Sequence, residues 1–471
     1  MAFLIGGANS AADTTFSVAN SCRFNRADSA YMHKTPGGAG STKIFTFSAW
    51  VKRGTIGSNQ ILLNAGEGDT TDDWLFYFHS GDTIKIFDFS NSGATTNIAV
   101  LTNQFFRDVS AWYHLVLAVD TSQGTAANRV KLYVNGTQVS SFATATYPDQ
   151  NFVIDVNSTD THWIGRRGDD NDYFDGYMAE VCMIDGTQYA ASDFGEFDED
   201  SPTIWKPKDV SGLTFGTNGF YLDFEDSSNL GNDKNGGTDL TEVNLAATDQ
   251  ATDSPSNNFA TLNPLSGLIS SISYKEGNTH FTNSSADTHR MVNSTIAAAS
   301  GKWYAEVKVT ELGGTYPQIG IIDPDKFDHD GHLGISNGGY GYLSNGNKQF
   351  NGSAASFGDS YATDDIIGIA MDLTNNKLYF AKNGTWQNSG DPTSGATGTG
   401  SAYDIASGVF YTFGQSSYDS GTDPEYQWNF GNPSYANSSD AADANGYGAF
   451  EYAPPSGYLA LCTKNLGSDG G

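Results

Sequence analysis

Short runs of alternating apolar and polar residues recur along the whole chain. The run IFTFSAWV at 44–51 places Phe45, Phe47 and Ala49 on one side of an extended strand. Comparable runs rich in Val, Ile, Phe, Tyr and Thr follow at intervals of roughly 8–15 residues, and clusters of Gly, Asn and Asp separate them. Helix-like patterns are confined to short patches at 189–196 and 294–299. The pattern predicts an all-β protein built from two antiparallel β-sandwiches.

Each half of the chain contains the same hairpin pattern. In the first half VLAVDT precedes RVKLYVNG at 129–136, and in the second half IGIAMDLT precedes KLYFAKNG at 377–384. Both patterns end in Asn-Gly, a dipeptide that adopts the positive φ angles of a tight hairpin turn. We therefore expect the same antiparallel hairpin in each sandwich.

A polar stretch rich in Gly and Asn interrupts the strand pattern between about 227 and 265. Such a composition is typical of a linker or a surface connection. We therefore predict four segments: an N-terminal docking arm at 1–14, a sandwich at 15–229, a linker at 230–264 and a second sandwich at 265–471. The arm has no basic residues before its short apolar stretch, so we do not expect it to be a secretory signal.

Charge and cysteine content narrow the functional classes. The 471 residues include 24 Lys and Arg against 54 Asp and Glu, which gives a formal charge of −30. Nucleic-acid binding needs clustered cations, and membrane insertion needs about 18 consecutive apolar residues. The sequence has no cluster of cations and no apolar run of this length, so we expect neither nucleic-acid binding nor membrane insertion. Cys22, Cys182 and Cys462 each stand within an apolar run, which favours three buried thiols over a disulfide framework.

Ordered motifs connect each half to a known family. FTFSAWVKRG, AWYHLVLAVDTSQGTAANRVKLYVNGTQV, THWIGRR and YFDGYMAEVCMIDG follow one another within residues 15–225. This half resembles the concanavalin A-like lectin/glucanase superfamily, in particular its laminin-G-like jelly rolls. GKWYAEVKV, GYGYLSNGNKQFNG, DDIIGIAMDLTNNKLYFAKNGTW and APPSGYLALC lie within residues 265–465, which resemble an SPRY domain. The resemblances imply a jelly roll followed by an SPRY-like sandwich, and both families are associated with binding.

The tandem as a whole, with GEFDEDSPTIWKPK and GTNGFYLDFEDSSNLGNDKNG between its main motifs, is similar to structural proteins of marine tailed bacteriophages. That resemblance implies a non-enzymatic protein of the virion surface, such as a tail fibre or spike, assembled in the host cytoplasm. It would attach the particle to a host-surface glycan or protein through sandwich loops. Its other partners would be virion proteins, reached through the arm at 1–14, and further copies of the chain, with a trimer as one form. The alternative is a purely structural subunit that decorates the head or builds a fibre.

The motif GEFDED at 195–200 offers a catalytic alternative. On an extended strand, Glu196, Asp198 and Asp200 would share one face about 7 Å apart, which resembles the acidic strand motif of the superfamily's retaining glucanases. There the outer carboxylates serve as nucleophile and acid/base, but Asp200 stands where that family expects Glu. Turn-forming residues also flank the motif. A glycan depolymerase is thus the second alternative, and we expect no enzyme.

Two acidic loops are candidates for calcium binding. GDDNDYFDG supplies Asp169, Asp170, Asp172 and Asp175, and DPDKFDHDG supplies Asp323, Asp325, Asp328 and Asp330. Calcium takes six to eight oxygen ligands, which a carboxylate-rich loop and its carbonyl groups provide. Neither loop has EF-hand spacing, and a solvated acidic loop is the alternative for both.

Aromatic residues near these loops are candidates for ligand contact, because sugar rings stack on aromatic faces. They are Trp163, Tyr173 and Phe174 in the first half and Tyr340, Tyr342, Phe350 and Trp386 in the second. Packing within the sandwiches is the alternative for each of them.

Overall fold

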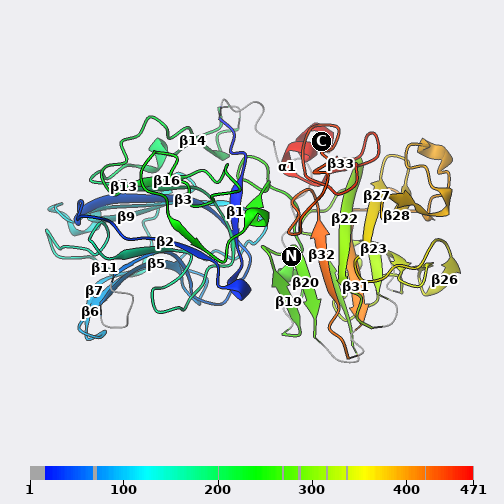
Figure 1. Ribbon diagram of the computed structural model, residues 1–471, viewed down its shortest axis with the longest axis horizontal. Coiled ribbons are helices and arrows are strands. Elements are labelled where there is room, and N and C mark those ends of the chain that lie inside the picture. The colour runs from blue at the N-terminus through cyan, green and yellow to red at the C-terminus, as the bar shows by residue number, and fades with distance from the viewer. Residues whose placement is uncertain are drawn as a thin grey trace. The chain divides into compact units, whose positions relative to one another are not determined.

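The computed structural model describes residues 16–66, 72–199, 201–267, 270–284, 288–314, 317–335, 338–418 and 421–469. Nearly all of the regular structure in these ranges is β (Figure 1). The chain divides into two compact units, and the division falls between Ser256 and Asn257. The all-β prediction is confirmed.

The N-terminal unit contains two antiparallel sheets of eight strands each, as counted over the described residues, and they form two layers in Figure 1. The first has the order β10–β9–β8–β3–β13–β1–β18, with β16 paired to β13. Its strands are β1 (Ser21–Phe24), β3 (Ile44–Arg53), β8 (Tyr113–Asp120), β9 (Val130–Val134), β10 (Thr137–Gln138), β13 (Gly176–Asp185), β16 (Phe220–Leu222) and β18 (Gln250–Ala251).

The second sheet of this unit has the order β11–β7–β6–β5–β4–β12–β2–β17. Its strands are β2 (Tyr31–Lys34), β4 (Gln60–Gly66), β5 (Asp73–Phe78), β6 (Ile84–Ser90), β7 (Thr95–Thr102), β11 (Phe142–Thr146), β12 (Thr161–Ile164) and β17 (Thr241–Val243). A separate two-stranded sheet joins β14 (Gly195–Phe197) to β15 (Trp205–Pro207).

The described part of the C-terminal unit also contains two sheets. The larger has the order β19–β20–β32–β22–β27–β28–β29, with β30 paired to β28 and β33 parallel to β22. The smaller has the order β21–β31–β23–β24–β25–β26. The strands are β19 (Ile272–Lys275), β20 (His280–Asn283), β21 (His289–Asn293), β22 (Lys302–Glu311), β23 (Gln318–Ile322), β24 (Gly339–Leu343), β25 (Asn347–Phe350), β26 (Ser353–Ser356), β27 (Ile366–Asp372), β28 (Lys377–Lys382), β29 (Thr385–Trp386), β30 (Tyr403–Asp404), β31 (Thr412–Tyr418), β32 (Glu425–Asn429) and β33 (Leu459–Ala460).

Within the described ranges, helical structure is limited to single turns and one short helix. The turns are η1 (Arg26–Asp28), η2 (Ala126–Asn128), η3 (Ala191–Asp193), η4 (Ala247–Asp249), η5 (Pro264–Ser266), η6 (Pro324–Lys326), η7 (Gln387–Ser389) and η8 (Gly395–Thr397), and the helix is α1 (Thr463–Asp469). The expected patch at 189–196 corresponds to η3, whereas the one at 294–299 is not helical. Among the described residues, no helix is long and apolar enough to span a membrane.

Side-chain alternation explains how the sheets pack. In β5, Trp74 and Phe76 lie in the core between the two sheets, whereas Leu75 and Tyr77 belong to a separate cluster on the opposite face. Neighbouring residues of a strand point to opposite faces, so a strand buried on one side presents a second set of side chains on the other. The candidate functional site lies on this second face.

The repeated hairpin is present in both units. β8 pairs with β9 and β9 with β10, and β27 pairs with β28 and β28 with β29 in the same antiparallel order. The turns are Asn135-Gly136, with φ of 46° and 78°, and Asn383-Gly384, with φ of 47° and 76°. Positive φ at both central residues is the tight turn that Asn-Gly favours, so the prediction is confirmed at both places.

The interval 230–264, predicted as a linker, is folded instead. Within it β17 pairs with β2, and β18 pairs with β1. The buried carboxylate of Asp253 accepts from Lys52 Nζ at 2.6 Å and from Trp112 Nε1 at 3.0 Å. Two- and three-residue edge strands leave no periodic signal, so the composition predicts a linker. In the structure, residues 230–256 belong to the N-terminal unit and residues 257–264 to the C-terminal unit. The three cysteines are buried and free, as predicted.

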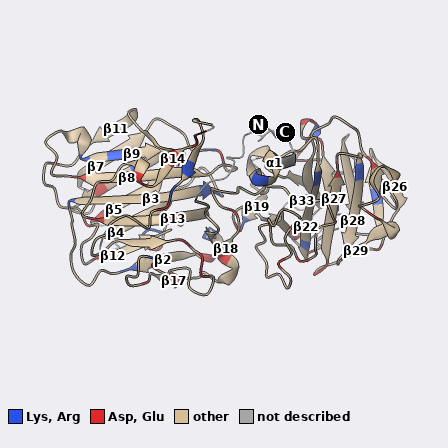
Figure 2. Ribbon diagram, turned by 90° about the horizontal axis from the view of Figure 1, so that it is seen from above, with Lys and Arg blue, Asp and Glu red and all other residues tan. Residues whose placement is uncertain are grey.

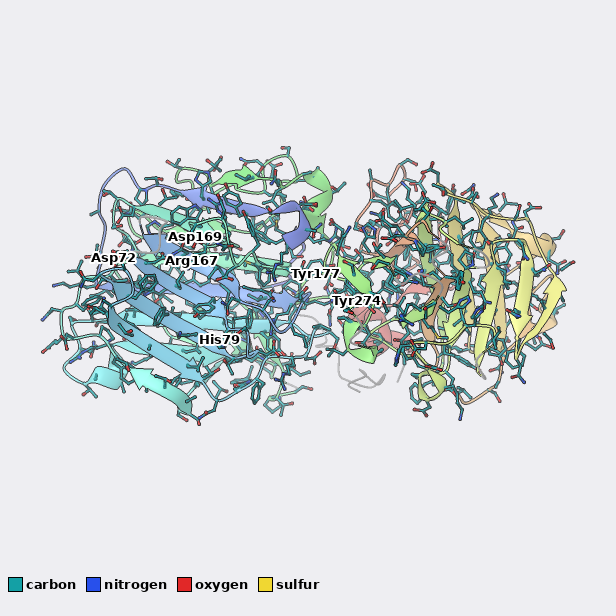
Figure 3. All side chains as sticks on the ribbon, turned by 90° about the horizontal axis from the view of Figure 1, so that it is seen from below. Asp72, His79, Arg167, Asp169, Tyr177 and Tyr274 are labelled. Atoms are coloured by element: carbon teal, nitrogen blue, oxygen red, sulfur yellow. The ribbon has the colours of Figure 1, made fainter. Side chains whose placement is uncertain are left out.

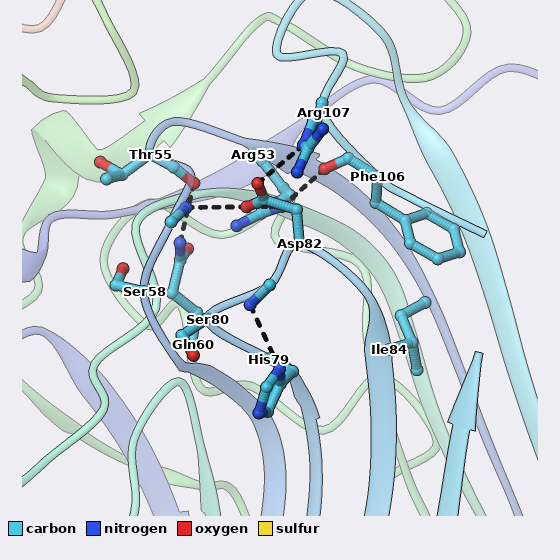
Figure 4. Close-up of polar contacts among 12 residues, drawn as sticks. Arg53, Thr55, Ser58, Gln60, His79, Ser80, Asp82, Ile84, Phe106 and Arg107 are labelled. Carbon is cyan, nitrogen blue, oxygen red and sulfur yellow. Dashed lines mark hydrogen bonds and ion pairs between the residues drawn. The ribbon is translucent and has the colours of Figure 1, made fainter. Parts of the chain in front are cut away.

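Asp82, in the turn between β5 and β6, connects the end of β3 to two loops (Figure 4). Its Oδ1 accepts from Arg53 Nη1 at 3.2 Å and from the Gly57 N–H at 2.7 Å, and its Oδ2 accepts from Arg107 Nε at 3.0 Å. Arg53 is 1% exposed and also donates to the carbonyl of Phe106. Burial raises the pKa of Asp82, but the Gly57 N–H and the two guanidinium groups outweigh it and hold that pKa below its usual value.

We expect Asp82→Asn to lower the free energy of unfolding by about 3–5 kcal/mol, because it leaves the Arg53 guanidinium buried without a carboxylate. The pKa of Asp82 is lowered in the folded state. Its contribution is therefore present above the ordinary Asp pKa of about 4 and is lost as pH falls through the native value. Urea unfolding at several pH values measures the difference. Asp149→Asn, at an exposed carboxylate of the same unit, is the control, and equal stability of the two variants would contradict the assigned role.

Candidate functional site

The second face of the sheet that contains β5 carries a continuous row of side chains. Residues opposite one another in paired strands share a face. The register therefore places Trp163 of β12 beside His33 of β2 on one side and Asn64 of β4 on the other. The row continues through Leu75 of β5 to Phe87 of β6. All five residues face away from the core, because the residues that alternate with them fill it.

Tyr31, His33, Trp163, Tyr173 and Arg166 form what we call the aromatic cluster. The ring centroid of Tyr31 lies 5.9 Å from that of His33 and 6.4 Å from that of Tyr173. The guanidinium carbon of Arg166 lies 3.9 Å from the Tyr31 centroid and 6.0 Å from the Trp163 centroid. Trp163 is 8% exposed, and the other three rings are half-buried. Burial, and then the charge of Arg166, lower the pKa of His33, so its imidazole is neutral at neutral pH.

Arg167 holds the loop after β12 against this face. Its Nε donates to Asp73 Oδ2 at 2.8 Å, and its Nη1 lies 3.4 Å from Asp169 Oδ2. Arg167 and Asp169 are labelled in Figure 3. The N–H of Gly168 donates to Asn64 Oδ1 at 2.8 Å. Burial raises the pKa of Asp73 to about 6, although the contacts with Arg167 and Asn64 lower it. These contacts position the loop that completes the aromatic cluster.

Two of the three aromatic residues predicted in the first half, Trp163 and Tyr173, meet in the aromatic cluster. Phe174 instead points into the core and is fully buried there. Tyr31 and His33 are not among the predicted residues. Their signal is the alternation in YMHK, which places both on one face, but the sequence does not indicate that β2 lies beside β12.

The four carboxylates predicted as calcium ligands in this loop have separate partners. The pairs are Asp169 with Arg167, Asp170 with Arg166, Asp172 with Asn59 and Asp175 with Thr55. Across the ranges that the structure describes, no three Asp, Glu, His or Cys side chains are grouped so that they could hold a metal ion. The structure therefore does not assemble these carboxylates into one site, and calcium binding stays a prediction.

The carboxylates of the second acidic loop, at 323–330, also have separate partners. Asp323 caps η6 by accepting from the Asp325 N–H at 2.9 Å, and Asp328 accepts from the Asp330 N–H at 3.2 Å. Asp330 forms an ion pair with Arg290 at 2.5 Å. The carboxylates serve as turn caps and as a salt bridge, not as one converging set.

The aromatic residues predicted in the second half mainly pack within the C-terminal unit. Tyr342 is fully buried in the core, and Tyr340 is 5% exposed. Tyr340 stacks on Phe350 with centroids 4.4 Å apart, and Trp386 packs edge-on against Tyr304 at 6.4 Å. Only Phe350 and Trp386 of these four predicted residues keep half-buried rings.

The acidic motif at 195–200 lies outside both large sheets of the first unit. Glu196 is in β14, which pairs with β15, and its Oε1 lies 3.8 Å from Lys206 Nζ. Asp198 lies 3.4 Å from the same ammonium group, and Asp200 is outside the described residues. A glucanase-like motif needs an inner strand of a large sheet, and this segment is not one.

Among solved structures, the SPRY domain of human HERC1 is similar at 14% identity with a TM-score of 0.27, covering 32% of this chain and 87% of that one. No curated protein matches the chain. Two family models match parts of the chain: residues 27–189 match the concanavalin A-like lectin/glucanases superfamily, and residues 302–407 match the SPRY domain. These two matches show a concanavalin A-like domain in the first half of the chain and an SPRY domain in the second.

Proposed function

We propose that this chain is a non-enzymatic binding protein that holds a glycan on the aromatic cluster of its N-terminal sandwich. The observation that carries the proposal is the group of half-buried rings around Arg166 on the free face of a sheet. Aromatic rings grouped in this way with an exposed edge suit a ligand that has both apolar faces and hydroxyl groups.

The chemistry of the cluster suits a sugar ring. The C–H face of a pyranose stacks on an aromatic ring, and its hydroxyl groups need donors and acceptors at the edge. The neutral imidazole of His33 provides one of each. Tyr31 and Tyr173 provide hydroxyl groups that can donate or accept.

Charge favours a neutral sugar over an acidic one. Lys and Arg residues are scattered over the strands in Figure 2. The two guanidinium groups at the site are both matched by carboxylates: Arg166 pairs with Asp170, and Arg167 pairs with Asp73 and Asp169. An acidic glycan would meet carboxylates at this edge without a spare cation to pair with it.

We further propose that the chain acts on the surface of a virion, as part of a tail fibre, a spike or another appendage that contacts the host. This step rests on the resemblance of the tandem to structural proteins of tailed bacteriophages. The arm at 1–14, through which docking to other virion proteins is predicted, lies outside the described residues.

Tyr173→Ala should weaken glycan binding about two- to tenfold, since one aromatic contact is worth about 0.5–1.5 kcal/mol. An array of polysaccharides from bacterial surfaces identifies the ligand, and calorimetry measures the affinity. Phe105→Ala is the matched control, because Phe105 is 57% exposed and lies under Arg107 outside the cluster. Equal losses in both variants would contradict the site. Absence of any wild-type binding would favour the purely structural alternative.

Glycan binding and the melting temperature should both be unchanged by EDTA. The four carboxylates of the 169–175 loop each have a protein partner, so the contacts that hold the aromatic cluster do not require a metal ion. Differential scanning fluorimetry and the array, each run in calcium buffer and in EDTA, measure the two effects. A melting temperature that falls in EDTA would support the calcium site instead.

Antibodies raised against the chain should label intact particles in immunogold electron microscopy, because the proposed role requires an exposed glycan-binding face. Labelling at the tail would support an attachment role, and labelling confined to the head would favour decoration. Particles disrupted before labelling are the control for antibody quality. Labelling of disrupted particles alone would contradict a surface position.

A further inference from the structure

A cavity of about 430 Å³ lies on the other eight-stranded sheet of the N-terminal unit, in contact with β13 and β16. Its size is within the range of small-ligand sites. Phe16, Val18 and Phe215 form an apolar part of its lining, and Glu180 and Tyr221 lie within the polar part. None of these residues belongs to the aromatic cluster.

Glu180 enters this cavity because β13 contains a bulge. Ala179 pairs with Trp50 and Cys182 pairs with Ser48, so two residues of β13 oppose one residue of β3. Glu180 has a φ of 50° and is 6% exposed. A bulge of this kind redirects a side chain that regular alternation would send to the core.

The carboxyl group of Glu180 is bound by the protein and also lines the cavity. Its Oε2 accepts from the Tyr221 hydroxyl at 2.6 Å. The side chain is 6% exposed and is part of the cavity lining, so a donor inside the cavity can reach the carboxyl group. A hydrogen bond from a ligand would offset part of the cost of burying this group.

The charges around the cavity are predominantly negative. Asp223 and Glu225 pair with Lys234 at 2.7 and 2.9 Å, so this ammonium group is already matched. Asp209 accepts from the Ser211 N–H at 2.8 Å, and no described cation pairs with it or with Glu180. Burial and, to a smaller extent, the charges of Asp223, Glu225 and Asp209 raise the pKa of Glu180, and the hydrogen bond from Tyr221 lowers it. The net result is a pKa of about 8.

We propose that this cavity binds an aliphatic amine, with the ammonium group beside Glu180 and Asp209 and the hydrocarbon chain against Phe16, Val18 and Phe215. The ammonium group supplies a hydrogen-bond donor to the Glu180 carboxyl group. It also supplies a positive charge beside Glu180 and Asp209, because the ammonium group of Lys234 in the lining is already paired with Asp223 and Glu225. The apolar part of the lining favours an organic cation over a metal ion. This site is independent of glycan binding, which uses the opposite sheet.

Binding is coupled to a proton. In the empty cavity Glu180 is mostly a neutral acid at pH 7, and an ammonium group beside it favours the carboxylate. The acid therefore gives its proton to the buffer when the amine binds. Because the carboxylate is the binding form, affinity rises with pH until the native pKa of Glu180 is passed, while the amine stays charged to about pH 10.

Calorimetry of the full chain with cadaverine, in phosphate and in Tris at pH 7, tests the proposal. The two buffers differ in ionisation enthalpy, so the difference in heat counts the protons released. The wild type should release close to one proton per cadaverine and bind about tenfold more tightly at pH 7 than at pH 6. Binding without proton release, or no binding at all, would overturn the proposal.

Glu180→Gln should lower the affinity at least tenfold and abolish proton release. This variant leaves the charge of the empty cavity almost unchanged at pH 7, so a loss is not a general effect of charge. Asp226→Asn, at a neighbouring carboxylate outside the lining, should bind as the wild type does. Ser211→Trp, which fills the cavity from an exposed loop position, should also lose binding at an unchanged melting temperature. Equal affinity of Glu180→Gln and the wild type would overturn the assignment.

Discussion

The packing of two sheets face to face is the interaction on which the rest of the N-terminal unit depends. It buries one side of every central strand, and side-chain alternation then leaves a second side that the core does not use. The aromatic cluster occupies that second side on β2 and β12. The Glu180 cavity lies against the other sheet, at the bulge of β13. Both candidate sites therefore follow from the same constraint, applied to two different sheets.

Electrostatic contacts decide how loops lie on these second faces. Arg167 joins its loop to Asp73, a carboxylate buried enough for its pKa to be raised. Asp82 connects the end of β3 to two loops through Arg53 and Arg107. Buried ion pairs of this kind contribute little net stability, but breaking one leaves a buried charge without a partner. The contacts of Arg167 hold the loop that carries Arg166 and Tyr173, both of which lie against Tyr31.

In the C-terminal unit, too, a buried carboxylate holds a segment without regular structure in place. This carboxylate is that of Glu306, and the segment lies near the end of the chain. Glu306 of β22 accepts from the N–H groups of Glu451 and Tyr452 at 2.9 and 2.8 Å and from the hydroxyl of Tyr304 at 3.1 Å. The C-terminal segment is thereby held beside β22, to which β33 pairs in parallel. Most of the aromatic residues predicted there as ligand contacts pack within the unit.

Features that depend only on neighbouring residues can be predicted from the sequence. The turns at Asn135-Gly136 and Asn383-Gly384 depend on two adjacent residues, and the burial of Cys22 depends on the apolar run around it, so both are visible in sequence. The composition of the segment at 230–264 predicts a linker, whereas the structure joins Asp253 in this segment to the distant residues Lys52 and Trp112. No local pattern records such contacts.

The sequence by itself determined the strands, their turns, the all-β class and the two kinds of domain, because these follow from alternation, turn residues and ordered motifs. Only the tertiary structure decided which residues lie together on the faces of the two N-terminal sheets that point away from the core. Tyr31 and Trp163 are more than 100 residues apart, and they meet because β2 pairs with β12. Glu180 lines a cavity because one extra residue in β13 redirects it. Strand order and bulge position arise from long-range pairing, which a pattern of neighbouring residues does not encode.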